Sequence, residues 1–335
     1  MAIKSKPALL LCVFGVTVAT CCWHQRQQPV IAPKPAAVSK DLGQHAYDHV
    51  AALVALGPRH TGSPGWYRAT AYIKQELKKL GLTPKRDRWV HPIEKLTFEN
   101  IWVTFPGKSK DRLILACHHD TKCCSGHPEL RDNFHFVGAN DSGSGVGLLL
   151  ALAKELADPK NDRKSDRKNI ATIQLVFFDG EESIPFDWDL KRALFGSRRF
   201  VRRYQQERLD LGGGPRIRGL VLLDMVGAVD LQIDDETNSD RSMHRVLRSA
   251  ARACGHQRYF FQHPYQVTDD HMVFLDDGIP AIDLIDLYDN PQWHTVDDTL
   301  DQISAKSLQI VGEVVLTALP ALERLLFPEQ FRRGR

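Results

Sequence analysis

Three apolar segments of the chain each end abruptly in acidic or imidazole side chains. The runs 113–117, 172–178 and 220–223 are almost entirely apolar, which is typical of strands that are buried on both faces. The polar groups that follow the three runs in turn are His118, His119 and Asp120; Asp179, Glu181 and Glu182; and Asp224. Because ligands bind beyond the carboxyl ends of the strands in parallel sheets, we expect these groups to share one site.

The remaining periodicity places helices between the strands. Apolar residues recur at helical spacing in 46–56, 66–80, 148–156 and 305–325, and further strands are expected at 88–91, 100–105 and 281–285. The charged stretch 158–168 is interpreted as a solvated loop. The sequence therefore predicts one α/β domain, with a central mixed, mostly parallel, twisted sheet sandwiched by helices.

Both ends of the chain are expected to lie outside this domain. Lys4 and Lys6 precede a short apolar run, so residues 1–22 are interpreted as a signal peptide, or as a membrane or lipoprotein anchor with lipid on Cys21. Residues 23–42 are proline-containing and are expected to form a linker, 43–328 the folded domain and 329–335 a basic tail. We therefore expect an exported, periplasmic or otherwise extracytoplasmic protein that touches the membrane only through its N-terminus.

Charge and cysteine content narrow the function classes further. The formal net charge is +3, and no basic stripe with interleaved aromatic residues occurs, so a nucleic-acid partner is not expected. The domain contains four cysteines, Cys117, Cys123, Cys124 and Cys254, without paired metal-ligand spacing. A bridge between neighbours is strained, so Cys123 or Cys124 could pair only with Cys117 or Cys254, and the sequence leaves this open.

Three acidic or imidazole side chains from distant segments form the ligand set of a catalytic zinc ion. Glu182 follows Glu181, so one carboxylate can bind a metal while the other stays free for acid–base chemistry. Asp141 lies in the small-residue loop 138–145, and His294 supplies an imidazole. Taken alone, each has a structural alternative: an exposed acidic loop, a helix N-cap, or a structural histidine. Together they match the three protein ligands of a catalytic zinc site.

A second metal position is also available from the same segments. His118 and Asp224 could bind another ion, with Asp141 bridging the two. Asp120 lies two residues beyond His118 and could orient a neighbouring imidazole.

The order of these residues resembles the co-catalytic zinc aminopeptidase family, which includes the animal-type glutaminyl cyclases. The resemblance covers about 57–325 and rests on the ordered set His118-x-Asp120, Asp141, Glu181-Glu182, Asp224 and His294. Segments 136–142, 194–198 and 269–280, and the tryptophan directly before the histidine, Trp293, are similar to the cyclase branch. A zinc exopeptidase-like fold is thereby implied.

The resemblance also implies roles for individual residues. One zinc ion would be held by Asp141, Glu182 and His294, and the second position at His118 and Asp224 would stay empty, as it typically does in cyclases. Glu181 would shuttle the proton, with Asp269 as its partner and Asp224 completing the acidic group. Trp293 and Trp188 would line the substrate pocket.

Two departures from the cyclase pattern are visible. An extra residue precedes Trp188, and the usual disulfide partner of the cysteine matching Cys117 is replaced by Val146, so that bridge is not expected.

The loop 122–134 is expected to cover the pocket, because it links His118 to Asp141.

Three functions follow in order of preference. The first is a monomeric glutaminyl-peptide cyclotransferase, which converts N-terminal glutamine of peptides or proteins to pyroglutamate with release of ammonia and uses one zinc ion. The alternative is a two-zinc aminopeptidase in which Glu181 deprotonates the attacking water. The third is an inactive binding domain, which the complete set of ligand and acid–base residues disfavours. A serine hydrolase lacks a suitable Gly-x-Ser-x-Gly elbow.

Overall fold

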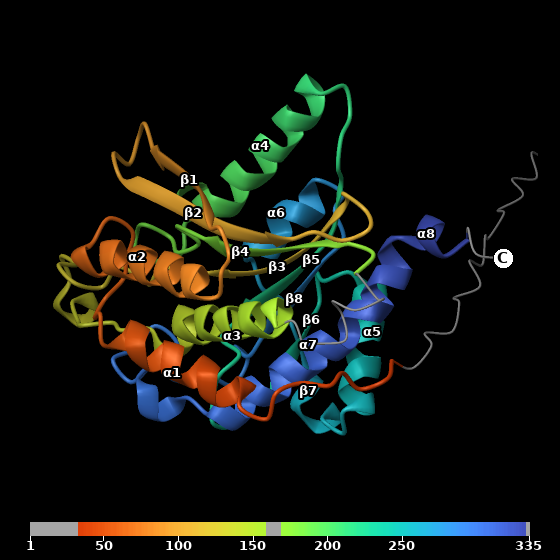
Figure 1. Cartoon of the computed structure of the whole chain (residues 1–335). Helices are drawn as coiled ribbons and strands as arrows, with labels where there is room; N and C mark the ends of the chain where they lie inside the picture. The colour runs from red at the N-terminus through yellow and green to blue at the C-terminus, as the bar shows by residue number, and fades with distance from the viewer. Residues whose placement is uncertain (1–32, 159–168, 333–335) are drawn as a thin grey trace, which may run out of the picture.

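A six-stranded sheet forms the centre of the protein. The computed structural model describes residues 33–158 and 169–332. The strands lie in the order β1-β2-β4-β3-β5-β8 (Figure 1). Their bounds are Lys85–Val90 (β1), Thr97–Phe105 (β2), Arg112–His118 (β3), Thr172–Phe178 (β4), Ile217–Asp224 (β5) and Ala281–Ile285 (β8). A separate pair, β6 (Ile233–Glu236) and β7 (Phe260–Tyr265), forms a small second sheet.

The sheet is mixed and mostly parallel, as predicted. β3 pairs in parallel with β4 and β5, and β5 pairs in parallel with β8. The two strands at the other edge are antiparallel, since β1 pairs with β2 and β2 with β4 in this way. His118 on β3 is in register with Phe178 at the end of β4. The parallel strands therefore finish at the same edge, which positions their following residues together.

Helices cover both faces of the sheet (Figure 1). Alternate residues of β3 divide between two apolar clusters: Leu113 and Leu115 face one, and Ile114 and Ala116 face the other. This period-two division is what a sheet buried on both sides requires. The larger cluster contains residues of α1 (Leu42–Val54), α2 (Pro64–Lys79), α3 (Gly145–Ala157), α5 (Arg241–Ala253) and α7 (Ala305–Leu326). The smaller cluster contains residues of α4 (Phe195–Asp210) and α6 (Asp270–Asp276).

Side-chain caps define the starts of several helices. Ser63 accepts a hydrogen bond from the backbone N–H of Trp66 at the start of α2, and Asp240 accepts from Ser242 and Met243 at the start of α5. Ser304 caps α7 in the same way. These side chains satisfy N–H groups that the helix itself leaves unpaired. α7 is apolar and long enough to cross a membrane by composition, but 72% of its apolar window is buried in the domain, as in a core helix.

The predicted single α/β domain is confirmed, with adjustments at its ends. The expected signal or anchor, Cys21, most of the linker and nearly all of the charged loop 158–168 lie outside the described residues. α1 begins at Leu42, the last residue of the predicted linker, and α8 (Pro328–Arg332) includes the first part of the predicted basic tail. The four domain cysteines are free thiols, so the disulfide that the sequence left open is not formed.

Candidate metal centre and substrate pocket

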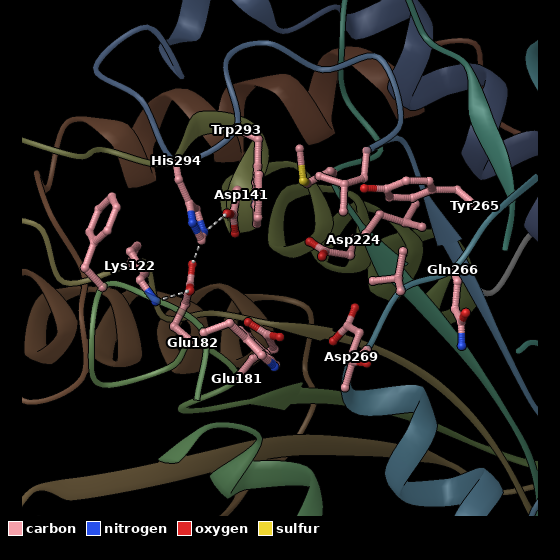
Figure 2. A pocket seen from close by; sticks show the side chains of 17 residues that line it. Lys122, Asp141, Glu181, Glu182, Asp224, Tyr265, Gln266, Asp269, Trp293 and His294 are labelled. Atoms are coloured by element: carbon pink, nitrogen blue, oxygen red, sulfur yellow. Dashed lines mark hydrogen bonds and ion pairs between the residues drawn. The ribbon is translucent and has the colours of Figure 1, made fainter. Parts of the chain in front are cut away.

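The first candidate metal group consists of Asp141, Glu182 and His294. The Nε2 atom of His294 lies 3.2 Å from Asp141 Oδ2 and 3.2 Å from Glu182 Oε1 (Figure 2). Burial alone would lower the pKa of His294, but the charges of Glu182 and Asp141 and their hydrogen bonds raise it to about 10. The structure thus brings together the three side chains that the sequence assigned to one zinc ion.

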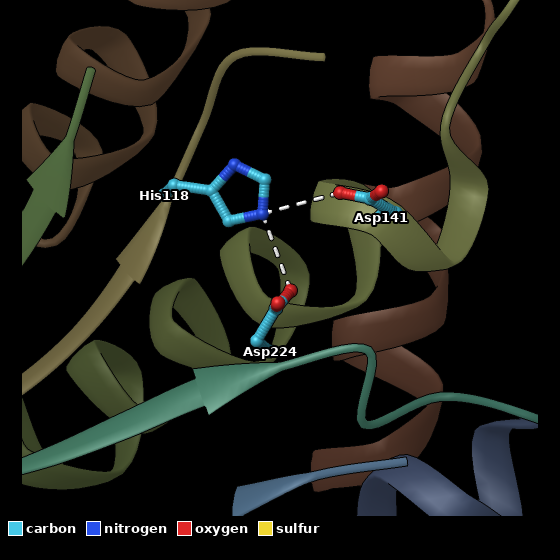
Figure 3. A group of neighbouring side chains, drawn as sticks. All are labelled: His118, Asp141 and Asp224. Atoms are coloured by element: carbon cyan, nitrogen blue, oxygen red, sulfur yellow. Dashed lines mark hydrogen bonds and ion pairs between the residues drawn. The ribbon is translucent and has the colours of Figure 1, made fainter. Parts of the chain in front are cut away.

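The second group shares Asp141 with the first. His118 Nε2 lies 3.2 Å from Asp141 Oδ1 and 3.2 Å from Asp224 Oδ1 (Figure 3). Burial would lower the pKa of His118, yet Asp224, Asp120 and Asp141 raise it well above its ordinary value. Burial raises the pKa of Asp224 to about 7, against the opposing charge of His118. Asp141 therefore offers one carboxylate oxygen to each group, as a bridging ligand would.

The spacing of these atoms fits zinc. Ligands that lie about 2.0 to 2.2 Å from a tetrahedral zinc ion are separated by roughly 3.3 Å, and the contacts above are all 3.2 Å. Two further atoms in the groups, Glu182 Oε2 and His118 Nδ1, are buried without a hydrogen-bond partner. Several carboxylates converge on an imidazole nitrogen in this buried site. They create a strongly negative electrostatic potential, which suits a divalent cation.

Glu181 lies beside the first group and outside both. It is buried in the pocket wall near Asp224 and Asp269 (Figure 2). Burial raises the pKa of the Glu181 carboxyl well above its ordinary value, and the charge of Asp269 raises it further. Burial also raises the pKa of Asp269. This arrangement is typical of a carboxyl group that exchanges protons near neutral pH.

Asp120 contacts two parts of the centre. Its Oδ1 lies 3.6 Å from His118 Nδ1, where the sequence placed it as an orienting group. Its two carboxylate oxygens also accept hydrogen bonds from the backbone N–H groups of Gly180, Glu181 and Glu182, at 2.8 to 3.3 Å. Gly180 has a φ of +67°, and an added Cβ would lie 2.4 Å from the Phe98 ring. The turn that presents the two glutamates thus depends on this glycine and on Asp120.

A cavity of about 280 Å³ opens directly above these groups. Its lining includes the aromatic side chains of Phe186, Trp188 and Trp293, together with residues 265–269, Ile285 and Leu287. The Trp293 ring stacks on the His294 ring with centroids 4.2 Å apart. Trp188 and Trp293 are 43% and 45% exposed, so both are available to a bound molecule. The structure therefore places both predicted tryptophans at one cavity with the metal groups.

The family model for peptidase family M28 matches residues 100–319, which is more than half of the chain. The chain belongs to peptidase family M28. A glutaminyl-peptide cyclotransferase-like protein of Bos taurus is 31% identical, over 83% of this chain and 79% of that one.

Solved structures agree with this membership. A glutaminyl cyclase of an Acidobacteriales bacterium has a TM-score of 0.72 and is 33% identical, covering 88% of this chain and 99% of that one. A Zn-dependent exopeptidase of Parabacteroides distasonis has a TM-score of 0.71 and is 26% identical, covering 87% of this chain and 99% of that one. The M28 chain is thus an enzyme with a zinc exopeptidase-like fold, similar to glutaminyl cyclases over most of its length.

Two residues that sequence reasoning missed hold the Asp141 loop of this M28 protein. The fully buried Arg59 donates to the carbonyls of Val137 at 2.6 Å and Gly138 at 2.8 Å. Asp298 accepts the N–H groups of Asn140 at 2.7 Å and Asp141 at 3.1 Å. A charged side chain that organises a buried loop cannot be distinguished by sequence from a solvated one, although Asp298 lies four residues after His294.

Lys122 is a third residue that the sequence did not assign to the site. It lines the cavity and is 1% exposed, with its Nζ 3.6 Å from Glu182 Oε2 and donating to the Ser183 carbonyl at 2.9 Å. It is also the only residue of the loop 122–134 that lines this cavity. The expectation that this loop covers the pocket is therefore wrong. The His127 ring of this loop contacts the ring of Phe186, which lines the cavity, with centroids 5.4 Å apart.

Proposed function

We propose that this M28 protein is a glutaminyl-peptide cyclotransferase, which converts N-terminal glutamine of peptides to pyroglutamate and releases ammonia. The observation that carries the proposal is the likeness to a glutaminyl cyclase over 88% of this chain and 99% of that one. The pocket adds chemical support, because a free buried carboxyl, Glu181, lies beside a three-residue metal group under aromatic side chains.

The first metal group would supply the zinc ligands for this reaction. Asp141, Glu182 and His294 would hold one zinc ion, which suits their donor atoms and spacing. When bound there, zinc supplies Lewis acidity to the γ-carboxamide oxygen of the substrate glutamine.

The protein's own side chains account for the proton movements. As the α-amine nitrogen attacks the γ-carbonyl carbon, Glu181 accepts a proton from that nitrogen. The bond to the amide nitrogen then breaks, and Glu181 returns the proton to the departing ammonia. Burial, and next the charge of Asp269, keep the pKa of Glu181 high enough for this exchange.

The pocket walls exclude competing water. Both reacting groups belong to one glutamine residue, so binding needs only to fold the side chain back onto the amine. Trp293 and Trp188 would enclose that side chain, and an apolar enclosure keeps hydrolysis from competing with cyclisation.

A two-zinc aminopeptidase is the second candidate. The specific observation in its favour is the complete second group, His118, Asp141 and Asp224, whose contacts are as short as those of the first. In that reaction Glu181 would deprotonate the attacking water, and both metal positions would be filled.

Product analysis separates the two candidates. We expect purified protein incubated with a glutaminyl dipeptide to form ammonia and the pyroglutamyl dipeptide in equal amounts, without free amino acids. Elemental analysis is expected to find one zinc ion per chain. Release of the second amino acid together with two zinc ions per chain would instead identify an aminopeptidase.

Replacing Trp293 tests the proposed pocket. Trp293→Ala is expected to raise KM by roughly tenfold, the effect of losing about 1.4 kcal/mol of contact energy. Zinc content should be measured alongside, since the indole also stacks on His294. Val296→Ala is a matched control, because Val296 is exposed on the same segment and does not line the cavity. An unchanged KM in Trp293→Ala would remove the indole from the substrate site.

We further propose that the enzyme is a monomer that acts outside the cytoplasm and is attached, if at all, through residues 1–22. The basic start, short apolar run and Cys21 support this placement. Fractionation of cells that express the full chain, with and without residues 1–22, tests it.

A further inference from the structure

Behind the pocket, a row of buried ionisable side chains leads away from Asp269. It consists of Glu236 at the end of β6, His271 on α6 and Asp283 on β8. All three are 0% exposed, and Asp269 is 2% exposed. Glu236, His271 and Asp283 belong to neither of the two metal groups described above and take no part in the proposed proton transfer.

The contacts run in one direction from Glu236 towards the pocket. His271 Nε2 lies 3.3 Å from Glu236 Oε2, and His271 Nδ1 lies 3.6 Å from Asp283 Oδ2. Asp269, His271 and Asp283 each have one side-chain N or O atom in a common cluster, in which all three atoms lie within 4.8 Å of one another. The imidazole therefore sits between two carboxylates, and the second of these adjoins the carboxyl of Asp269.

Glu236 fixes the far end of this row. Its carboxylate accepts hydrogen bonds from the N–H and hydroxyl of Ser239 at 2.7 and 2.8 Å, and from the N–H groups of Asn238 and Val267. The Ser239 hydroxyl also accepts the N–H of Asp283 at 3.0 Å. Val267 belongs to the pocket wall just before Asp269. A carboxylate with this many donors has one orientation, so it is a rigid support for His271.

Burying such a row of ionisable side chains costs free energy of folding unless the side chains interact with one another. Charges that are fully buried must be paired, and burial together with the nearby charge of Asp269 raises the pKa of the Asp283 carboxyl well above its ordinary value. No other basic side chain among the described residues lies within 4.0 Å of the carboxylate oxygens of Glu236 or Asp283. His271 is thus the group that links them, and Asp283 is the group that restrains the Asp269 carboxyl from behind.

We propose that Glu236, His271 and Asp283 are positioning residues that act in series to hold the carboxyl of Asp269 towards Glu181. The inference rests on the proposed function, in which Asp269 is the partner of Glu181. Because the row does not touch the metal groups or the aromatic wall, it should affect turnover rather than metal or substrate binding.

The test uses Asp283→Asn and Glu236→Gln, which keep side-chain size and remove one charge, in the full-length protein. We expect kcat for a glutaminyl dipeptide to fall by about 10- to 100-fold in each, the range for a slightly misplaced catalytic group. KM and zinc content should stay near wild type. The double variant should fall no further than the worse single variant, because residues acting in series are not additive.

Asp286→Asn is the matched control. Asp286 is a buried carboxyl just beyond β8 that accepts the N–H of Gln232 at 3.0 Å and has no contact with the row. Its kcat is expected to equal that of wild type. If Asp283→Asn fails to fold, Glu236→Gln still tests the inference, because its kcat should fall while its KM stays unchanged.

Three results would overturn the inference. Wild-type kcat in both variants would show that the row does not position Asp269. Additive losses in the double variant would contradict action in series. An extra metal ion in wild type that is lost in Asp283→Asn but kept in Asp141→Asn would make the row a metal site. A wild-type protein that forms no pyroglutamate contradicts the proposed function itself, and so is distinguishable from all three.

Discussion

Glu181→Gln is expected to lose roughly 100- to 10,000-fold in kcat, the usual contribution of a general acid–base group. The amide keeps the shape of the carboxyl but neither accepts a proton from the α-amine nor returns one to ammonia. Glu181 is buried beside Asp269, and neither metal group includes it. Zinc content should therefore stay at the wild-type value, as should KM.

The measurement is steady-state ammonia release with zinc analysis on the same preparation. Glu313→Gln serves as the control, because Glu313 on α7 pairs with His256 and does not line the pocket. Full turnover by Glu181→Gln would show that another group carries the proton. Loss of zinc together with activity would instead place Glu181 among the ligands.

Removal of the metal is the other large effect. Asp141→Asn is expected to lose zinc and to lower activity on the order of 1000-fold or more, because the several kcal/mol of Lewis acidity disappear with the ion. Asp141 contacts both His118 and His294, so it is the one side chain whose loss weakens both metal groups. Chelation of the wild-type protein should have the same effect, and added zinc should restore activity.

His118→Gln provides the discriminating comparison. His118 belongs only to the second group, so a cyclase with one zinc ion should keep its metal content and most of its turnover in this variant. An aminopeptidase that fills both positions should lose one ion and its activity. Undiminished turnover of metal-free wild-type protein would contradict every mechanism that involves zinc.

The location of the site was predictable because the sheet is largely parallel. The apolar runs before His118, Glu181 and Asp224 are strands β3, β4 and β5, and adjacent parallel strands have to end together. The polar residue after each run therefore had a predictable position in space. Asp141 and His294 carried weaker signals, and it was their order along the chain that tied them to the same site.

What remained hidden was the support around the site. Arg59 and Lys122 resemble the many solvated cations of the chain, and Lys and Arg are almost never fully buried, so sequence favours the wrong reading for both. Their environments form from segments that are distant in sequence: Arg59 contacts the carbonyl of Gly138, and Lys122 that of Ser183. No local pattern encodes such contacts.

Helix α5, like α4 and α6, was not predicted, although the signal of α5 is present in the sequence. Met243, Val246, Leu247, Ala250 and Ala251 face the core from α5 at helical spacing. Arginines occupy several of the positions between them and interrupt the apolar pattern of the segment. The β6–β7 pair carried less signal. β6 reads Ile-Asp-Asp-Glu, and two of its three acidic residues, Asp234 and Glu236, are buried by partners from other segments.

The proposed ligands of the first metal group are separated by long stretches of chain, at positions 141, 182 and 294. An unfolded chain would have to close two large loops to bring them together, so it has little affinity for the ion. Zinc binding is consequently coupled to completion of the whole domain, and the bound ion favours the native state by mass action. The melting temperature should rise with free zinc concentration, which makes retained zinc a practical readout of correct folding for every variant proposed above.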